Sequence, residues 1–201
     1  MAAPSILLFQ IGGMGVLVFM LAILPLKGGN TVHLLRAESS GPSVSKIMPK
    51  VQTSASILYL IYIGLTALEA VLLKLGGMTL FDSLNYAMST AATGGFGVYN
   101  EGIGVYNSDF INIVVTVFMF LFGLNFNVYF LLLAGKPKEI LKKSEIKVYF
   151  LLIFISILTI GFFVREYYDN IKDCVVNTAF TVGAFMTSTG FALTDFDVWP
   201  L

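Results

Sequence analysis

The chain has 201 residues, of which 57% are hydrophobic and 12% are charged, and its mean hydropathy is +0.85. About a quarter of the residues in a typical soluble domain are charged, so this composition excludes an ordinary water-soluble fold. Twelve basic and twelve acidic side chains cancel, which excludes nucleic-acid binding through bulk charge. The single cysteine and single histidine exclude an intrachain disulfide and a metal centre built from those residue types. The composition therefore indicates a membrane protein.

Four apolar stretches are long enough to be interpreted as membrane-spanning segments, at 6–26, 55–75, 111–134 and 148–164. A hydrocarbon core of about 30 Å requires about 20 helical residues, so the first three fit and the last is at the short limit. The spans are expected to be helical, because a lipid-exposed strand would leave backbone N–H and C=O groups unpaired. The first stretch has neither a basic flank nor a small-residue cleavage site, so we interpret it as a span and not as a signal peptide.

The charges of the connecting segments predict the orientation of the spans. The connections at 27–50 and 136–147 are rich in lysine and arginine, whereas the connection at 76–110 contains neither. Loops rich in basic residues remain on the cytoplasmic side of a membrane. The first two connections are therefore predicted to be cytoplasmic and the third to be external.

The external connection contains a short amphipathic helix, predicted over 79–91, which is too short to cross a membrane. Thr79 followed by Asp82 is a capping-box pattern that marks its start. It ends at 92–97, where three glycines break any helix. A short apolar helix followed by a glycine-rich extended segment is typical of a re-entrant pore loop.

The same pattern returns near the end of the chain. Asp173 is expected to cap a second short helix over 175–186, which stops at 187–191. Superposing the two Gly-Phe pairs places Gly95 on Gly190, 95 residues later. The sequence thus predicts an all-α membrane protein organised as span, re-entrant loop, span, and then repeated.

Both glycine-rich segments have the chemistry of a cation-selective constriction. A dehydrated alkali cation needs several oxygen ligands, which an extended strand supplies through its backbone carbonyls. Glycine allows the required φ values, and threonine and serine add hydroxyl oxygens. The alternative for one copy alone is a plain glycine-rich turn, but two related copies favour a pore loop. The predicted ion-binding residues are Thr93, Gly94, Gly95, Ser188, Thr189 and Gly190.

Several further motifs keep the same order and spacing as in a known family. They are QIGGMG at 10–15, ESSGP at 38–42, STAATGGF at 89–96, GLNF at 123–126, TSTGF at 187–191 and DVWP at 197–200. With these motifs the chain resembles the Trk/Ktr/HKT superfamily of potassium and sodium transporters, and within it the Trk-type membrane subunits of bacteria.

The resemblance implies four span–loop–span units around a central pore, of which this chain carries an incomplete set. Residues 1–54 would be the closing span of the first unit with its cytoplasmic loop, 55–134 the second unit, and 135–201 the first span and pore loop of the third. The predicted function is potassium uptake through a backbone-carbonyl selectivity filter. K⁺ would be the transported ion, bound at Gly95, Gly190 and adjacent carbonyls, with no other cofactor.

The same resemblance implies a multi-pass protein of the inner (plasma) membrane that pairs as a homodimer and is controlled by a cytoplasmic, nucleotide-binding ring. The two basic connections are candidate contacts for that ring, although anionic lipid head groups would serve equally. No nucleic-acid partner is expected.

Three other functions are compatible with a membrane protein of this kind. A sodium-conducting member of the superfamily would differ mainly in the absent first unit. A secondary transporter would use its glycine-interrupted segments as broken helices around a midplane site. A membrane enzyme would need a polar catalytic set, and the sequence offers no cluster of histidine, cysteine or paired intramembrane carboxylates.

Three polar residues inside the predicted spans need partners. Asn125 and Asn127 are expected to bond neighbouring backbone and shape a helix break, more than to line an ion path. For Glu69 the alternatives stay open: a functional role, or else snorkelling or a pairing with Lys74.

Overall fold

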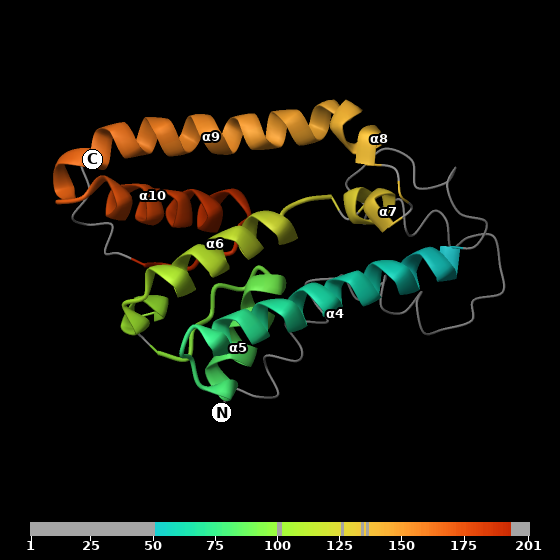
Figure 1. Ribbon diagram of the computed structural model, residues 1–201, viewed down its shortest axis with the longest axis horizontal. Coiled ribbons are helices and arrows are strands. Elements are labelled where there is room, and N and C mark those ends of the chain that lie inside the picture. The colour runs from blue at the N-terminus through green and yellow to red at the C-terminus, as the bar shows by residue number, and fades with distance from the viewer. Residues whose placement is uncertain (1–50, 100–101, 126, 134, 136, 194–201) are drawn as a thin grey trace.

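The computed structural model describes residues 51–99, 102–125, 127–133, 135 and 137–193, and within these ranges all regular structure is helical. The span expected at 6–26, the connection at 27–50, and the motifs at 10–15, 38–42 and 197–200 lie outside the described residues. The elements, shown in Figure 1, are α4 (Val51–Leu75), α5 (Leu80–Ala91), η2 (Gly102–Tyr106), α6 (Asp109–Phe122), α7 (Asn127–Leu133), α8 (Pro137–Lys142), α9 (Ser144–Val164), η3 (Arg165–Tyr167) and α10 (Ile171–Met186).

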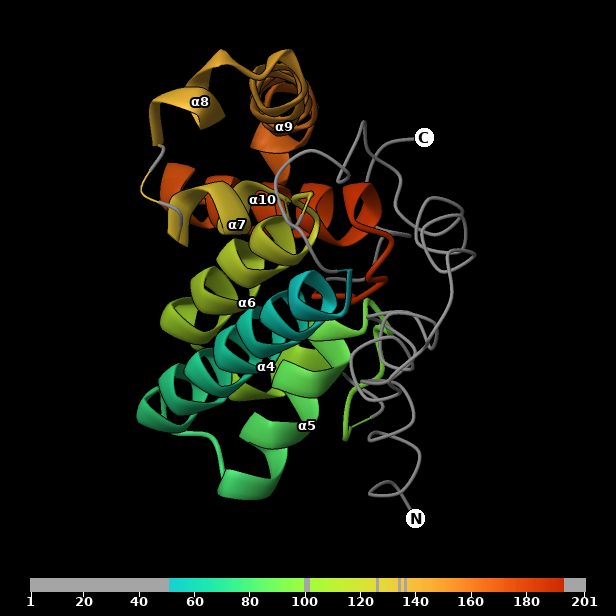
Figure 2. The same cartoon turned by 90° about the vertical axis from the view of Figure 1, so that its right-hand side faces the viewer.

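Helix α6 lies between two pairs of helices. It contacts α4 and α5, which pack on each other, and on its other side it contacts α10, which packs on α9. Figures 1 and 2 show this order, with α9 and α10 at one end of the stack and α4 and α5 at the other. Lys172 of α10 also forms an ion pair with Asp109 at the start of α6. The short helices α5 and α10 are thereby held to the same central helix.

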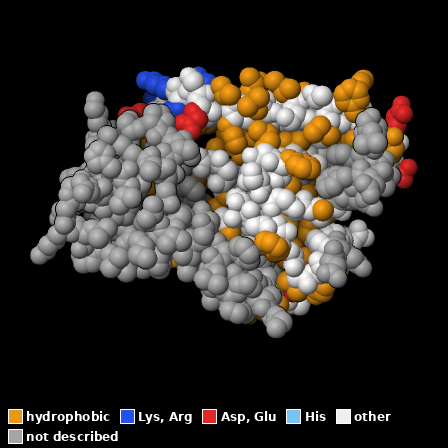
Figure 3. Space-filling model, turned by 180° about the vertical axis from the view of Figure 1, so that it is seen from behind, with side chains coloured by type: hydrophobic (Ala, Val, Ile, Leu, Met, Phe, Trp, Pro, Cys, Tyr) orange, Lys and Arg blue, Asp and Glu red, His pale blue; other side chains and the backbone are white. Residues whose placement is uncertain are grey.

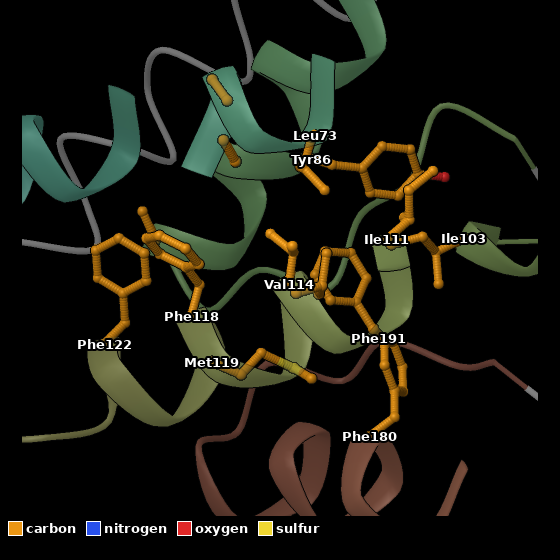
Figure 4. Packing of buried hydrophobic residues seen from close by; sticks show 14 of the residues in the cluster. Leu73, Tyr86, Ile103, Ile111, Val114, Phe118, Met119, Phe122, Phe180 and Phe191 are labelled. Atoms are coloured by element: carbon orange, nitrogen blue, oxygen red, sulfur yellow. The ribbon is translucent and has the colours of Figure 1, made fainter. Parts of the chain in front are cut away.

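The apolar residues of α6 explain why it occupies the centre. Its buried positions recur at the three- and four-residue spacing of one helix face, namely Ile111, Val114, Val115, Phe118, Met119 and Phe122. These side chains form the main buried cluster with Tyr86 of α5 and Phe180 of α10 (Figure 4). Phe110, Ile113 and Val117 of the same helix are exposed. A helix that is apolar on all sides is typical of a membrane environment.

Helix α9 exposes most of its large apolar side chains. Phe154, Leu158 and Phe162 are 61%, 57% and 80% exposed, and the hydrophobic surface extends along the upper edge of the molecule in Figure 3, where α9 runs. Two helical segments, Ser56–Leu75 and Ser144–Tyr167, are long and apolar enough to cross a membrane. They correspond to the spans expected at 55–75 and 148–164. An exposed apolar face of this size is typical of a helix that meets lipid or other transmembrane helices.

The expectation of one continuous span at 111–134 is wrong, because the chain breaks between α6 and α7. The 14 residues of α6 reach about 21 Å, less than the hydrocarbon core requires. Gly123 follows α6, and a Cβ there would lie 2.6 Å from the Tyr149 hydroxyl of α9. Asn125 donates a hydrogen bond to Glu145 of α9 at 3.3 Å. The predicted break is present, and close packing against α9 accompanies it.

Two tyrosine hydroxyls donate to backbone carbonyl groups at the break. Tyr149 of α9 donates to the Phe120 carbonyl at 3.1 Å, and Tyr129 of α7 donates to the Leu121 carbonyl at 2.7 Å. A helix end leaves its last carbonyls without intrahelical partners, and an unpaired carbonyl in an apolar environment is costly. The break is therefore a supported feature of the fold.

The start of α10 also differs from the expectation. The helix begins at Ile171, four residues before 175, so Asp173 lies in its first turn and is not its N-cap. Asn170 occupies the N-cap position with extended backbone, and its side-chain amide donates to Asp173 at 3.1 Å. An acidic side chain in the first turn still matches the positive end of the helix dipole. The expected end of the helix, at Met186, is confirmed.

Helix α5 has the bounds and the cap that the sequence predicts. Thr79 is the N-cap: its Oγ1 accepts the Asp82 backbone N–H at 3.1 Å, and its hydroxyl donates to the Asp82 carboxylate at 2.7 Å. This exchange is a local device that needs no tertiary packing.

We expect Thr79→Ala to lower the free energy of unfolding by about 1 kcal/mol, because the mutation removes the cap of α5. Thr79→Ser keeps the hydroxyl and should stay near the wild-type value. The matched control is Thr159→Ala on the exposed face of α9, where the hydroxyl bonds only to Ile155 of its own helix. Thermal unfolding in detergent measures all three variants, and equal losses for Thr79→Ala and Thr159→Ala would contradict the capping role.

Candidate functional site

Two loops follow the two short helices: the first loop is 92–97, after α5, and the second loop is 187–191, after α10. Thr93 and Ser188 have φ values of +50° and +57°, and Gly95 and Gly190 have +66° and +77°. Left-handed backbone is uncommon for residues other than glycine. The two loops therefore share an unusual alternation of left-handed residues, displaced by 95 positions.

The hydrogen bonds at the two helix ends repeat in the same way. The N–H groups of Ala92 and Thr187 donate to carbonyls four residues back, at 3.0 and 3.1 Å. The next N–H groups, of Thr93 and Ser188, donate three residues back, at 3.0 and 3.1 Å. Each helix thus tightens at its last turn before the chain leaves it, which satisfies its terminal carbonyls. The two helix ends therefore have the same backbone hydrogen-bond pattern at positions 95 residues apart.

The two loops lie against each other. A Cβ added to Gly95 would overlap the Thr189 carbonyl oxygen, and it would lie 3.0 Å from the Gly190 carbonyl carbon and 3.1 Å from its oxygen. Gly95 is therefore required both by its positive φ and by the approach of the second loop. The structure brings Gly95 and Gly190 together, as the sequence predicts.

The other predicted ion-binding residues lie at the same place with different exposure. Thr93 and Ser188 are exposed, Gly94 is half-buried and Thr189 is buried. The described residues contain no group of three acidic, histidine or cysteine side chains suited to a metal ion. The oxygens available at this contact are therefore backbone carbonyls and hydroxyls, which are ligands for alkali cations.

An aromatic contact behind the loops was not predicted from the sequence. Tyr86 of α5 is fully buried, and its hydroxyl would lie 2.8 Å from a Cβ at Gly97 of the first loop. Its ring centroid lies 5.9 Å from that of Phe191 in the second loop, and Figure 4 shows both rings in the buried cluster. Tyr86 therefore packs on both loops at once. In the sequence it has only the pattern of an ordinary core aromatic.

Asp82 ties the start of α5 to η2. Its buried carboxylate accepts hydrogen bonds from the hydroxyls of Thr79 and Tyr106, both at 2.7 Å. Burial and then the bond to this carboxylate raise the pKa of Tyr106 above its usual value, so the hydroxyl remains a donor at neutral pH. Segment η2 in turn approaches the chain after the second loop, since a Cβ at Gly102 would lie 2.8 Å from the Ala192 carbonyl oxygen.

Glu69 is fully buried in α4 at 0% exposure, which excludes snorkelling to the surface. Lys74 is exposed, and in the described part of the chain neither carboxylate oxygen of Glu69 has a hydrogen-bond partner. The polar side chain next to the Glu69 carboxyl group is that of Thr90 in α5. The carboxyl group thus lies between α4 and the helix that ends at the first loop.

A family model described as "TrkH: Cation transport protein" matches residues 3–200. The chain belongs to the TrkH cation transport family. The family model describes its members as cation transport proteins.

Named TrkH-family relatives match along nearly the whole chain. It is 33% identical over 196 residues to the Trk system potassium uptake protein TrkH of Escherichia coli K12. It is 32% identical over 194 residues to the same protein of Salmonella typhimurium, and 30% over 195 residues to TrkG of Escherichia coli K12. Each match covers 94% of this chain and 40% of the relative.

A solved TrkH-family structure has the same fold. The potassium transporter TrkH from Vibrio parahaemolyticus superposes with a TM-score of 0.78 at 28% identity, covering 97% of this chain and 40% of that chain. The chain therefore shares the fold of that transporter, which is helical throughout the residues described above, and it spans about 40% of the length of the relatives it matches.

We expect Gly95→Ala to destabilise the protein more than Gly190→Ala. Both mutations impose left-handed backbone on alanine, at roughly 1–2 kcal/mol, but only the Gly95 mutation also creates an overlap with the second loop, since nothing lies within 4 Å of a Cβ at Gly190. Gly64→Ala in α4, which has no such neighbour and no positive φ, is the control. Thermal midpoints in detergent give the ranking, and equal losses at Gly95 and Gly190 would contradict the close approach.

Proposed function

We propose that the chain forms part of a potassium-conducting pore in which the first and second loops are two of the four quarters of a selectivity filter. The observation that carries the proposal is the contact between two loops with the same left-handed backbone pattern. Carbonyl oxygens from neighbouring strands around one axis can replace the hydration shell of an alkali cation. Potassium is chosen because the relatives are named potassium uptake proteins.

The packing of the helices supports a repeated unit. Helix α5 packs on α4 before the first loop, and α10 packs on α9 before the second. We assign 55–134 to a second unit, with a broken closing span, and 135–201 to the first span and pore loop of a third. Residues 1–54 would be the closing span and cytoplasmic loop of the first unit.

The charge distribution supports an orientation with α8 in the cytoplasm. The start of α9 lies in a basic region, in which Lys138 and Lys142 are on α8, Lys143 precedes α9 and Lys147 is near its start. Figure 3 shows basic side chains gathered at that end of the molecule. The opposite end carries fewer basic residues, Arg165 and Lys172. By the positive-inside rule α9 runs outward, and α10 re-enters from the outer side toward its loop. We place the protein in the inner membrane as a multi-pass subunit.

The partners follow from family resemblance and remain proposals. We propose a homodimer that binds a cytoplasmic, nucleotide-binding ring through its basic connections, of which the exposed lysines beside α8 are the described part. Anionic lipid head groups also bind clusters of lysine side chains, so we propose lipid contact for the same surface.

One observation favours a second candidate function. The break between α6 and α7, beside the end of α10, is the kind of interrupted helix that secondary transporters place around a midplane site. That mechanism predicts saturable flux coupled to a second ion, whereas a pore predicts downhill flux.

The test is K⁺ and Na⁺ flux in liposomes that contain the full-length protein. We expect downhill K⁺ flux that exceeds Na⁺ flux, and we expect Gly95→Ser and Gly190→Ser each to reduce this preference. Gly64→Ser, far from any neighbouring atom, is the matched control. An unchanged preference in both filter mutants would remove these glycines from the filter, and saturable coupled flux would favour the secondary transporter.

A further inference from the structure

Ser89 of α5 holds the first loop at two points. Its backbone carbonyl accepts the Gly94 N–H at 2.9 Å, and its side-chain hydroxyl oxygen accepts the Phe96 N–H at 2.9 Å. The side chain is 5% exposed. We infer that Ser89 is a positioning residue for ion selectivity, because it fixes the direction of the Gly95 carbonyl; the inference rests on the proposed filter.

The direction follows from the geometry of the peptide bond. In a planar trans peptide the C=O of one residue and the N–H of the next point in opposite directions, and the described residues contain no cis peptide. Since the Phe96 N–H points to α5, the Gly95 carbonyl of the same peptide points away from α5. The Gly94 N–H fixes the Thr93 carbonyl in the same way. One serine therefore aims two carbonyl groups away from the helix that carries it.

The second loop lacks this hydroxyl. Residue Ala184 is 95 positions after Ser89, but its carbonyl accepts the N–H of Gly190, one residue beyond the position that corresponds to Gly94, at 3.1 Å. Its methyl side chain has no acceptor for the N–H of Phe191. The side-chain half of the Ser89 contact is therefore unique to the first loop within the part of the chain that the structure describes.

Threonine hydroxyls hold the second loop instead. Thr187 donates to the Gly183 carbonyl at 2.7 Å, and the hydroxyls of Thr187 and Thr189 lie 2.6 Å apart. Because Thr187 has one hydroxyl proton and gives it to Gly183, Thr189 is the donor to Thr187. The residues at the corresponding places of the first loop are Ala92 and Gly94, which have no hydroxyl. The two loops thus have left-handed residues at matching positions but are anchored by different side chains.

The test compares Ser89→Ala with Ser83→Ala in the full-length protein reconstituted in liposomes. Ser83 is buried on the same helix, and its hydroxyl bonds to the Leu80 carbonyl in the first turn, far in sequence from the loop. Losing one hydrogen bond that orients a ligand should lower the ratio of K⁺ to Na⁺ permeability by about three- to tenfold in Ser89→Ala. Ser83→Ala should keep the wild-type ratio, and Ser89→Thr, which retains the hydroxyl, should restore most of it.

The outcomes separate this inference from the proposed function. A wild-type protein without K⁺-selective flux would overturn the proposed function. A selective wild type whose ratio is unchanged in Ser89→Ala would overturn the positioning role alone. Should Ser89→Ala conduct neither ion, the thermal midpoint in KCl and in NaCl decides: we expect the wild type to be stabilised more by K⁺ and the variant to lose that difference. A retained difference would overturn the inference.

Discussion

The approach of Gly95 to the backbone of Thr189 and Gly190 is the constraint on which the rest of the structure depends. Two chain segments meet there without a side chain between them, so the helices that deliver them must end at the same level. Helix α6 provides the common support, because α5 and α10 both pack on it. Tyr86 and Phe191 fill the space behind the contact. The contact between the two loops thus depends both on glycine at position 95 and on the packed rings of Tyr86 and Phe191.

The break between α6 and α7 belongs to the same arrangement. A Cβ at Gly123 would lie 2.8 Å from the Thr187 methyl group, so the end of α6 reaches the first residue of the second loop. Tyrosine hydroxyls satisfy the Phe120 and Leu121 carbonyls at the break. These two bonds pair carbonyl groups that lipid would not satisfy, at an interruption of an apolar helix. Helix α6 ends early where it meets a neighbour, and not where its apolar character stops.

Local signals made part of this structure predictable. The bounds of α5 follow from Thr79 and the glycines, because capping and helix breaking act within a few residues. The contact of Gly95 with Gly190 followed from repetition of a motif. The sequence predicted a break near Asn125 and Asn127, but not that α6 ends at Phe122, because apolar character continues past that residue. It also missed the early start of α10, because Asp173 has the side chain of an N-cap residue. The hydrogen bond between Ser89 and Phe96 could not be predicted from the sequence, because the loop brings these residues together only by turning back on α5.

The unequal anchoring of the two loops has a consequence for how such a protein changes over time. In a pore formed by identical subunits, a single substitution changes every subunit at once. Here the two loops are separate segments of one chain, so a substitution at Ser89 leaves the hydrogen-bonded threonine pair of the second loop intact. Because the two loops are encoded separately, natural variation can change one loop while the other keeps its anchoring.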